Sequence, residues 1–289
     1  MKLIFYILLL LLLSSCGSNN NENNENNNEP LIPPLDVVFV EGGYIISPTM
    51  TNLYGTPIIM QDFYIGRFQV TQQEWYEVMG ENPSGFVNDN NPVETVSWYD
   101  VILFLNRRSE LAGLEPFYNI DKENADQNNL SESDNIRWAV TINDDANGYR
   151  LPTTIEWEYA AGGGQISRSY IFSGSDDPTQ VSWHFRNSGD IFLDGMWHWP
   201  TLEANNGRPR NVGQKPPNEL GLYDMSGNVR EWIWNWHHEE QLTPASGEWR
   251  GVRGGSWVAG EDAGRVGFRD GMPPYFRTYE LGFRVARNS

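Results

Sequence analysis

The stretch that decides the fold, residues 253–286, reads RGGSWVAGEDAGRVGFRDGMPPYFRTYELGFRVA. Its two ends, Arg-Gly-Gly-Ser-Trp and Leu-Gly-Phe-Arg-Val-Ala, look like fixed framework. The residues between them are an irregular mixture of small, acidic, apolar and aromatic types. Binding loops on rigid scaffolds combine a fixed carrier with free-form surface residues in this way. The stretch therefore predicts a stable frame that holds a surface segment.

The composition is that of one folded, acidic domain. The chain has 289 residues, of which 39% are hydrophobic and 12 are Trp, so it can form a substantial core. The formal net charge of −18 argues against a nucleic-acid partner, because phosphate-backbone binding requires clustered Lys and Arg. It argues equally against electrostatic attachment to an anionic membrane surface.

The N-terminus has the pattern of a secretory signal. Lys2 precedes an apolar run, residues 3–13, which is too short to span a membrane as a helix. The ending Leu-Ser-Ser-Cys resembles the bacterial lipobox, in which the cysteine is acylated and becomes the new N-terminus. We therefore expect a signal peptide at 1–15 and a lipid anchor on Cys16. Gly17 is not the Asp that commonly retains lipoproteins in the inner membrane, which favours the outer membrane.

The only cysteine of the chain is Cys16, so the mature domain has neither a disulfide nor a catalytic thiol. Residues 16–36 are dominated by Asn, Glu and Pro, which predicts a flexible tether. The folded domain is expected to cover residues 37–289.

Local patterns predict few regular elements. Thr71 and Glu74 form a capping box at the start of a helix over 72–79, and further helices are expected over 99–112 and 153–161. Strands are expected over 37–40 and 62–68, and the polar residues 121–135 suggest a surface loop. The remainder is rich in Gly, Pro and Trp and is expected to be irregular chain over a small sheet.

Five segments in one order resemble the formylglycine-generating enzyme family, also called the sulfatase-modifying-factor domain. They are NPVETVSWYDVILFLN (91–106), YRLPTTIEWEYAAGGG (149–164), VGQKPPNELGLYDMSGNVREW (212–232), VRGGSW (252–257) and LGFRVAR (281–287). The resemblance covers roughly residues 37–287. It implies an α+β fold, a variant of the C-type lectin fold with a small twisted antiparallel sheet, two main helices and much irregular chain.

The resemblance does not extend to the chemistry of the enzymes. In those enzymes two cysteines after the Gly-Gly-Ser motif bind copper and oxidise a substrate cysteine. Alignment on that motif places the two positions at Ala259 and Gly264, which cannot bind a metal. Relatives that use iron carry a His-rich site on an additional N-terminal domain, where this sequence has only the expected tether. We therefore expect neither a copper nor an iron site, and no enzymatic activity.

The resemblance also implies a structural calcium site in the segment DMSGNVRE, residues 224–231. Carried over, Asp224 and Glu231 would supply carboxylates, and Gly227 and Val229 would supply backbone carbonyls. Hard oxygen ligands of this kind suit Ca²⁺. The alternative is a turn with two solvated acidic residues.

Aromatic residues are dense in the segment 181–200, which carries Trp183, Phe185, Phe192, Trp197 and Trp199. They are either core residues and a loop staple or an aromatic platform beside a binding face. The sequence leaves both open.

The layout of the C-terminal stretch, with the lipobox and the tether, resembles the variable proteins of diversity-generating retroelements, in particular the treponemal variable lipoproteins. In that family, selected codons of a lectin-type face are rewritten. The resemblance implies a surface-displayed binding protein whose face lies within about residues 257–280. The residues expected in that face are Trp257, Glu261, Asp262, Phe268, Asp270, Met272, Tyr275, Phe276 and Tyr279.

Two other functions remain open. One is a fixed structural lipoprotein of an envelope machine, and the other is an enzyme of unknown chemistry on the same fold. In every case the frame residues at the two ends, from Arg253 to Gly255 and from Gly282 to Arg284, are expected to be structural. The ligand is expected to be a protein or another surface molecule.

Overall fold

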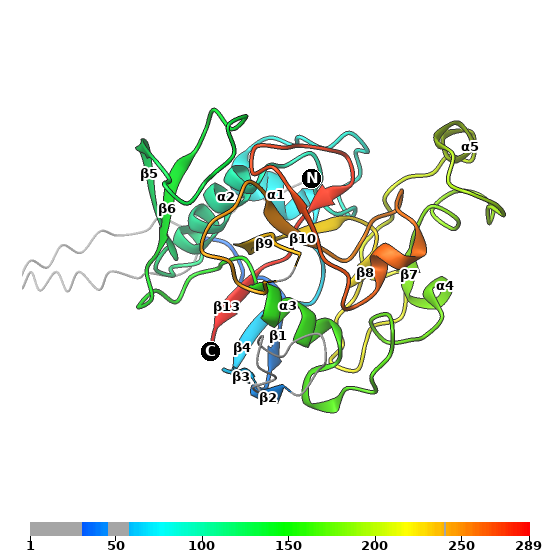
Figure 1. Cartoon of the computed structure of the whole chain (residues 1–289), viewed down its shortest axis with the longest axis horizontal. Coiled ribbons are helices and arrows are strands. Elements are labelled where there is room, and N and C mark those ends of the chain that lie inside the picture. Colours follow the sequence, from blue (N-terminus) through cyan, green and yellow to red (C-terminus); the bar gives the residue numbers. More distant parts are fainter. Residues whose placement is uncertain (1–30, 46–57, 240) are drawn as a thin grey trace, which may run out of the picture.

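The structure is a computed structural model, and it describes residues 31–45, 58–239 and 241–289 (Figure 1). The expected signal peptide, Cys16 and most of the expected tether lie outside the described residues. Two sheets form the centre of the molecule. One has the strand order β11-β10-β9-β12 and the other has the order β1-β4-β13.

Most strand pairs are antiparallel, as expected. The exceptions are β12 with β9 and β7 with β8, which pair in parallel over two residues each. The strands are β1 (Val37–Val40), β2 (Gly43–Ile45), β3 (Ile58–Met60), β4 (Phe63–Gly66), β5 (Tyr118–Ala125), β6 (Trp138–Ile142), β7 (Ser182–Trp183), β8 (Ser226–Gly227), β9 (Arg230–Trp236), β10 (Arg250–Arg253), β11 (Asp270–Met272), β12 (Leu281–Gly282) and β13 (Ala286–Asn288).

The three longest helices each begin with a capping box. At the first, Thr71 Oγ1 accepts from the amide of Glu74 while the Glu74 carboxylate accepts from the amide of Thr71, as predicted. The helices are α1 (Gln72–Met79), α2 (Trp98–Leu111), α3 (Thr154–Ala161), α4 (Pro178–Val181) and α5 (Trp199–Ala204), with 3-10 turns η1 (Gly164–Ile166) and η2 (Glu261–Gly264). Among the described residues, no helix has the length and apolar character needed to cross a membrane.

The main core lies between α1, α2 and the sheet that contains β9. Trp75 and Phe104 stack with ring centroids 5.1 Å apart, and Phe283 meets Phe104 edge-on at 5.3 Å. Trp98 and Trp232 close the same core and are fully buried. Burying an aromatic side chain of this kind contributes about 1.5–3 kcal/mol, so the aromatic-rich sequence supplies much of the stability.

The N-terminal boundary of the fold differs from the prediction. Residues 31–36, expected to be tether, lie against the domain: the amide of Leu31 donates to the Leu111 carbonyl at 2.8 Å. Leu35 is buried in the main core, and its amide donates to the hydroxyl of Tyr149 at 3.0 Å. The expected start at residue 37 is therefore too late, because Ile32 and Leu35 within the Pro-rich segment pack in the main core.

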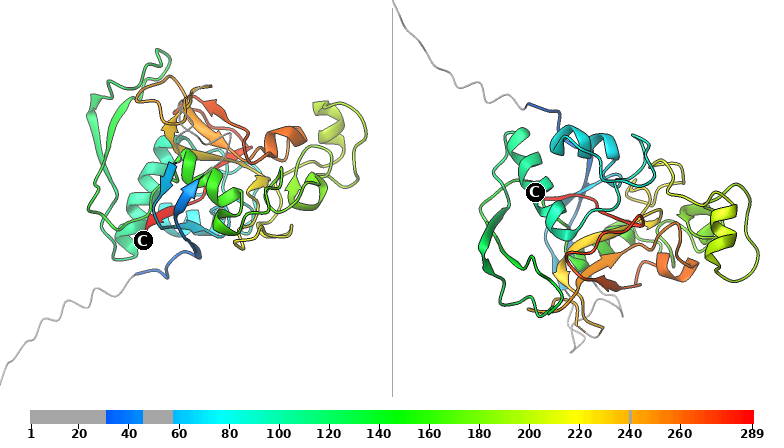
Figure 2. Two further views of the ribbon diagram at one scale, coloured as in Figure 1. Left: turned by 60° about the horizontal axis from the view of Figure 1, so that its bottom comes forward. Right: turned by 90° about the horizontal axis from the view of Figure 1, so that it is seen from above.

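Two excursions leave the body of the molecule at opposite ends, the β5–β6 hairpin at one and the loop that carries α5 at the other (Figures 1 and 2). The hairpin corrects the prediction of a surface loop over 121–135, since residues 121–125 belong to β5. Most side chains of β5 are exposed, so the strand does not require alternating apolar residues. Its polar sequence therefore lacks the pattern by which a strand is recognised.

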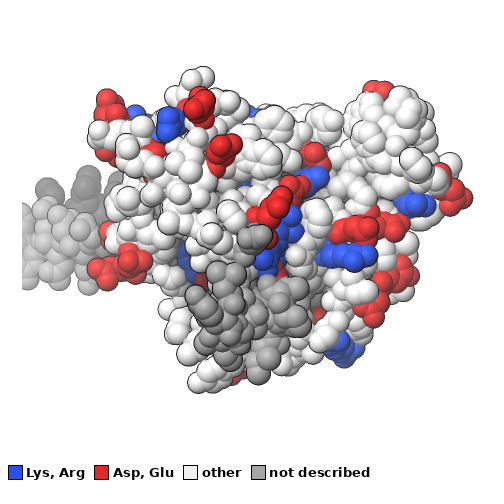
Figure 3. Space-filling model, viewed as in Figure 1, with Lys and Arg blue, Asp and Glu red and all other residues white. Residues whose placement is uncertain are grey.

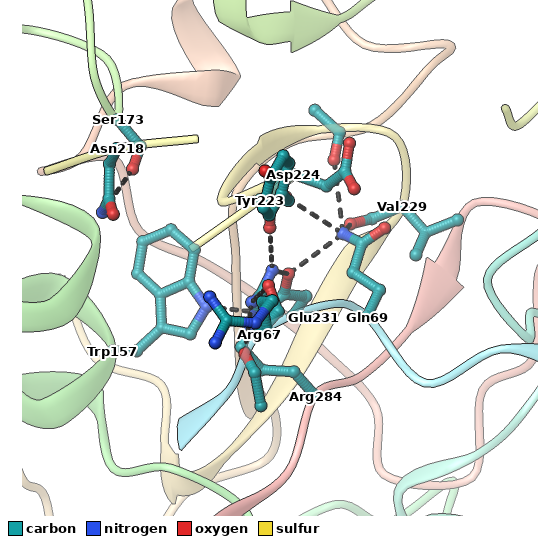
Figure 4. Close-up of polar contacts among 12 residues, drawn as sticks. Arg67, Gln69, Trp157, Ser173, Asn218, Tyr223, Asp224, Val229, Glu231 and Arg284 are labelled. Atoms are coloured by element: carbon teal, nitrogen blue, oxygen red, sulfur yellow. Dashed lines mark hydrogen bonds and ion pairs between the residues drawn. The ribbon is translucent and has the colours of Figure 1, made fainter. Parts of the chain in front are cut away.

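A buried polar network connects the sheets (Figure 4). Glu231 of β9 forms a double ion pair with Arg284, with N–O distances of 2.7 Å, and neither side chain has exposed surface. Arg284 also donates to the carbonyls of Gly66 and Tyr223 at 2.9 Å, and Trp157 Nε1 donates to Glu231 at 2.6 Å. The network therefore joins β4, α3, β9 and the C-terminal end of the chain.

We predict that Glu231→Gln lowers the free energy of unfolding by about 3–5 kcal/mol, because it leaves the Arg284 charge buried without a counter-charge. Urea denaturation of the purified domain measures the change. The matched control is Asp262→Ala, which breaks the exposed pair with Arg265 and should change the free energy by no more than about 0.5 kcal/mol. Equal effects of the two substitutions would contradict the role of the network.

Candidate binding surface

The first end of the C-terminal stretch is held by a second buried ion pair. Arg253 donates to Glu158 of α3 at 2.6 Å, and each side chain is about 1% exposed. The guanidinium also donates to the carbonyls of Val266 and Phe268, so it ties down the chain beyond the frame. Burial lowers the pKa of Arg253 to about 10, which leaves it charged at neutral pH.

Glycine is required at the turn that follows. Gly254 and Gly255 have positive φ angles of 88° and 69°. A Cβ on Gly255 would lie 2.7 Å from the backbone of Ala263, because η2 folds back onto this turn. At the other end, a Cβ on Gly282 would lie 2.3 Å from the Val93 carbonyl. Both ends are therefore fixed by close backbone packing, as the frame predicted from the sequence requires.

Between these ends, the expected contact residues differ in exposure. Phe268, Phe276 and Tyr279 are 37%, 40% and 38% exposed. Asp262, which precedes them in the same stretch, is also exposed. Glu261, Asp270, Met272 and Tyr275 are half-buried. Met272 also packs against the main core, so its contribution to a surface is small.

Trp257 does not belong to the surface, and the prediction is wrong for this residue. Its side chain has no exposed area and lies in a core cluster with Phe185, Leu202 and Val229. The indole Nε1 donates to the Tyr279 carbonyl at 3.0 Å. The tight glycine turn before Trp257 directs the ring inward, and sequence position alone does not determine that direction.

The acidic residues of the segment are paired with arginines. Arg230 lies between Asp270 and Glu280, at 2.5 Å and 3.2 Å. Glu261 pairs with Arg186 at 3.3 Å. Figure 3 shows that on one face of the molecule Lys and Arg lie beside Asp and Glu, without a continuous basic surface. The side chains of the segment that remain available for contact with a ligand are therefore its exposed aromatic rings.

The structure adds aromatic residues that the sequence did not assign to the face. The Tyr279 ring lies 5.6 Å from Trp199 and 6.2 Å from Phe86. Trp197 is 53% exposed, and its Nε1 donates to the Val258 carbonyl at 2.8 Å. In the aromatic segment 181–200, Phe185 is thus core while Trp197 joins the surface. The density of Trp in residues 181–200 pointed to this segment. Phe86 comes from a loop distant in the sequence, and nothing in that loop's sequence indicated a role in the face.

Comparison with known proteins identifies the family. The sulfatase-modifying factor enzyme 1-like domain matches residues 22–289. The chain belongs to the sulfatase-modifying factor family. The chaperone protein LppX of Paenibacillus barcinonensis is 46% identical over 258 residues, which cover 88% of this chain and 89% of that protein.

Among solved structures, Treponema denticola variable protein 1 has a TM-score of 0.70 and 30% identity, and the match covers 88% of this chain and 95% of that chain. The inactive Cα-formylglycine-generating enzyme 2 of Mus musculus is 34% identical over 149 residues, about half of each chain. These relatives confirm the predicted α+β fold of the formylglycine-generating-enzyme type.

The resemblance places the family's two catalytic cysteines at Ala259 and Gly264. The Ala259 carbonyl accepts from the amide of Phe185 at 3.0 Å, and the Gly264 carbonyl accepts from Ser226 Oγ at 2.7 Å. The backbone at both positions therefore holds residues 259–264 against Phe185 and against Ser226 of β8. Neither side chain supplies a thiolate for Cu(I).

The expected calcium ligands lie close together, but the side chain of Gln69 occupies the space between them (Figure 4). Gln69 Nε2 lies 2.8, 3.2 and 3.4 Å from the carbonyl oxygens of Val229, Asp224 and Gly227, and 2.9 Å from Glu231 Oε1, so its two N–H groups face four acceptors. All four neighbours are acceptors, so the nitrogen rather than the oxygen of the amide must face them.

The carboxylates are also engaged elsewhere. Glu231 is neutralised by Arg284, and Asp224 contributes its carbonyl to the Gln69 contact while its Oδ2 accepts from the amide of Gly213 at 2.7 Å. Burial raises the pKa of Asp224 to about 6. Within the described ranges, no group of three or more His, Cys, Asp or Glu could hold a metal. As arranged, the expected site does not fit Ca²⁺, which takes about 6–8 oxygen ligands at close range.

We predict that removal of calcium leaves the melting temperature unchanged, because Gln69 Nε2 lies among the converging oxygens and Arg284 neutralises Glu231. Thermal unfolding with a calcium chelator and with added Ca²⁺ measures this. A reproducible stabilisation by Ca²⁺ that the chelator reverses would show that Gln69 moves aside for the ion.

Proposed function

We propose that this protein is a non-catalytic binding protein that holds another polypeptide through the exposed part of residues 258–280. The observation that carries the proposal is the contrast within one stretch. Arg253, Phe283 and Arg284 are fully buried, whereas Phe268, Phe276 and Tyr279 between them present rings to solvent. Aromatic rings provide large contact area for few rotatable bonds, which suits protein recognition.

The relatives support binding of a polypeptide. A protein named a chaperone shares 46% of its residues with this chain over nearly the whole length of both. A variable protein shares the fold at 30% identity. The likeness to an inactive formylglycine-generating enzyme, together with Ala259 and Gly264 at the cysteine positions, favours a protein without the family's oxidase chemistry.

The proposal includes the cellular localisation expected from the sequence. Acylation of Cys16 would anchor the chain to the outer membrane, and the Asn- and Glu-rich residues that follow would hold the domain away from the lipid. The net charge of −18 favours protein partners over nucleic acid.

A finer proposal is that a retroelement diversifies the surface segment. The frame supports this, since exposed positions can change without loss of core packing. Deep sequencing of the 3′ end of the gene from a cultured population tests it. We expect substitutions confined to codons 258–280, at adenine positions of a nearby template copy. A uniform sequence without a template copy would contradict diversification and indicate one fixed partner.

For the binding face, we predict that the triple variant Phe268→Ala, Phe276→Ala and Tyr279→Ala loses its partners but melts within a few degrees of the parent, because surface substitutions rarely cost more than about 0.5 kcal/mol each. Quantitative mass spectrometry of proteins cross-linked to the full chain at the cell surface measures partner loss.

The matched control replaces exposed apolar residues elsewhere, namely Tyr44, Ile59 and Leu130, by Ala. It should keep the partners. Trp257→Ala serves as the buried contrast and should cost about 3–5 kcal/mol. Equal partner loss in the control triple, or none in the face triple, would overturn the proposed face.

A further inference from the structure

A surface pocket of about 480 Å³ lies beside the aromatic residues around Tyr279. One wall is the loop from Phe86 to Asn91, and the other comes from Arg208, Arg210 and Gln214. The walls are joined by hydrogen bonds: the amide of Val212 donates to the Asn90 carbonyl at 3.0 Å, and Asn91 Nδ2 donates to the Pro209 carbonyl at 3.4 Å. The pocket is therefore held in shape before any ligand enters.

Gln72 of α1 fixes the first wall from inside. Its Nε2 donates to the Phe86 carbonyl at 3.0 Å, and its Oε1 accepts from the amide of Asn88 at 3.0 Å. These contacts set the loop backbone, while the side chain of Val87 remains 75% exposed at the rim.

The charge of the pocket is opposite to that of the whole chain. Its lining includes Arg208 and Arg210 but neither Asp nor Glu. Arg208 is exposed and has no hydrogen bond or ion pair with any residue that the structure describes. The Arg210 guanidinium donates to the carbonyls of Ser188 and Gly189 and lies 5.6 Å from the centre of the Trp183 ring.

The two guanidinium groups also act on each other. Burial and, after it, the charge of Arg208 lower the pKa of Arg210, while Asp190 outside the lining opposes this weakly. Two positive charges without a carboxylate in the lining form a place where an anionic group gains Coulomb energy. The amide side chains of Asn88, Asn211 and Gln214 add donors around it.

An apolar strip continues from the pocket to the proposed binding face. The Phe86 ring packs edge-on against Trp257 at 5.2 Å and Tyr279 at 6.2 Å. Phe86 therefore belongs both to the aromatic group around Tyr279 and to the pocket that Val87 and Arg208 also line. In this order of contacts, aromatic residues are connected through apolar ones to a cationic group.

From this order we infer that the pocket binds an acidic side chain of the partner polypeptide, next to an aromatic or aliphatic residue of the same segment. This inference rests on the proposed function and specifies the chemistry of the partner. Arg208 would form the charge-assisted hydrogen bonds, which are stronger than neutral ones. An acidic sugar would present the same carboxylate, but without a large aromatic or aliphatic side chain for Phe86 and Val87.

The test uses fluorescence anisotropy of the full chain with two labelled peptides, Ser-Gly-Phe-Asp-Glu-Phe-Gly-Ser and its amide counterpart Ser-Gly-Phe-Asn-Gln-Phe-Gly-Ser. We expect the acidic peptide to bind about tenfold more tightly than the amide peptide. Arg208→Ala should remove this preference, and added salt should weaken it. The matched control is Arg107→Ala, an exposed arginine on α2 outside the pocket, which should retain the preference.

Equal binding of the two peptides, absence of binding by both, or an equal effect of the two arginine substitutions would overturn the inference. Displacement of the acidic peptide by glucuronate at lower concentration than by unlabelled peptide would overturn the choice of a polypeptide. The proposed function fails separately, since it depends on partner loss in the Phe268, Phe276 and Tyr279 variant and not on these peptides.

Discussion

The buried ion pair between Glu231 and Arg284 is the interaction on which the rest of the structure depends. It brings together β9, the C-terminal end of the chain, the carbonyl end of β4 and the indole of Trp157. Two opposite charges without solvent contact are stable only while every partner is in place. This requirement specifies one arrangement for segments that are far apart in sequence and rich in glycine and irregular chain.

The same principle explains why the exposed positions within residues 258–280 need not be fixed, although β11 in this stretch pairs with β10 in the sheet. A second buried pair, between Arg253 and Glu158, fixes the start of the stretch, and Arg284 fixes its end. The stabilising interactions are thus concentrated in the frame residues at the two ends. The exposed rings between the ends contribute little to the free energy of folding. A fold of this kind can carry different surfaces, or a single specialised one, without a new core.

The sequence predicted what depends on local chemistry. The capping box at Thr71 located α1, the helix expected over 153–161 corresponds to α3, and the motif segments indicated the family. It failed where tertiary contacts decide. The inward direction of Trp257 follows from backbone packing of η2, and the polar strand β5 is defined only by its pairing with β6.

Two further features have no sequence signal at all. Gln69 meets the carbonyl oxygens of residues 224–229 from more than 150 positions away. The arginine pocket likewise joins Phe86 to Arg208 through loops distant in the chain. Contacts of this range follow from the assembled fold, which is why the position of Gln69 and the pocket could be recognised only in three dimensions.

Native-state hydrogen exchange tests most directly whether a stable frame carries an independent surface segment. The amides of Gly66 and Val70 donate to the frame carbonyls of Val285 and Phe283, whereas those of Phe268 and Phe276 close only local turns. We predict that Gly66 and Val70 exchange only by global unfolding, and that Phe268 and Phe276 exchange by local opening at much lower free energy. Exchange of Phe268 and Phe276 as slow as that of Val70 would contradict the account, because the segment would then be part of the cooperative core.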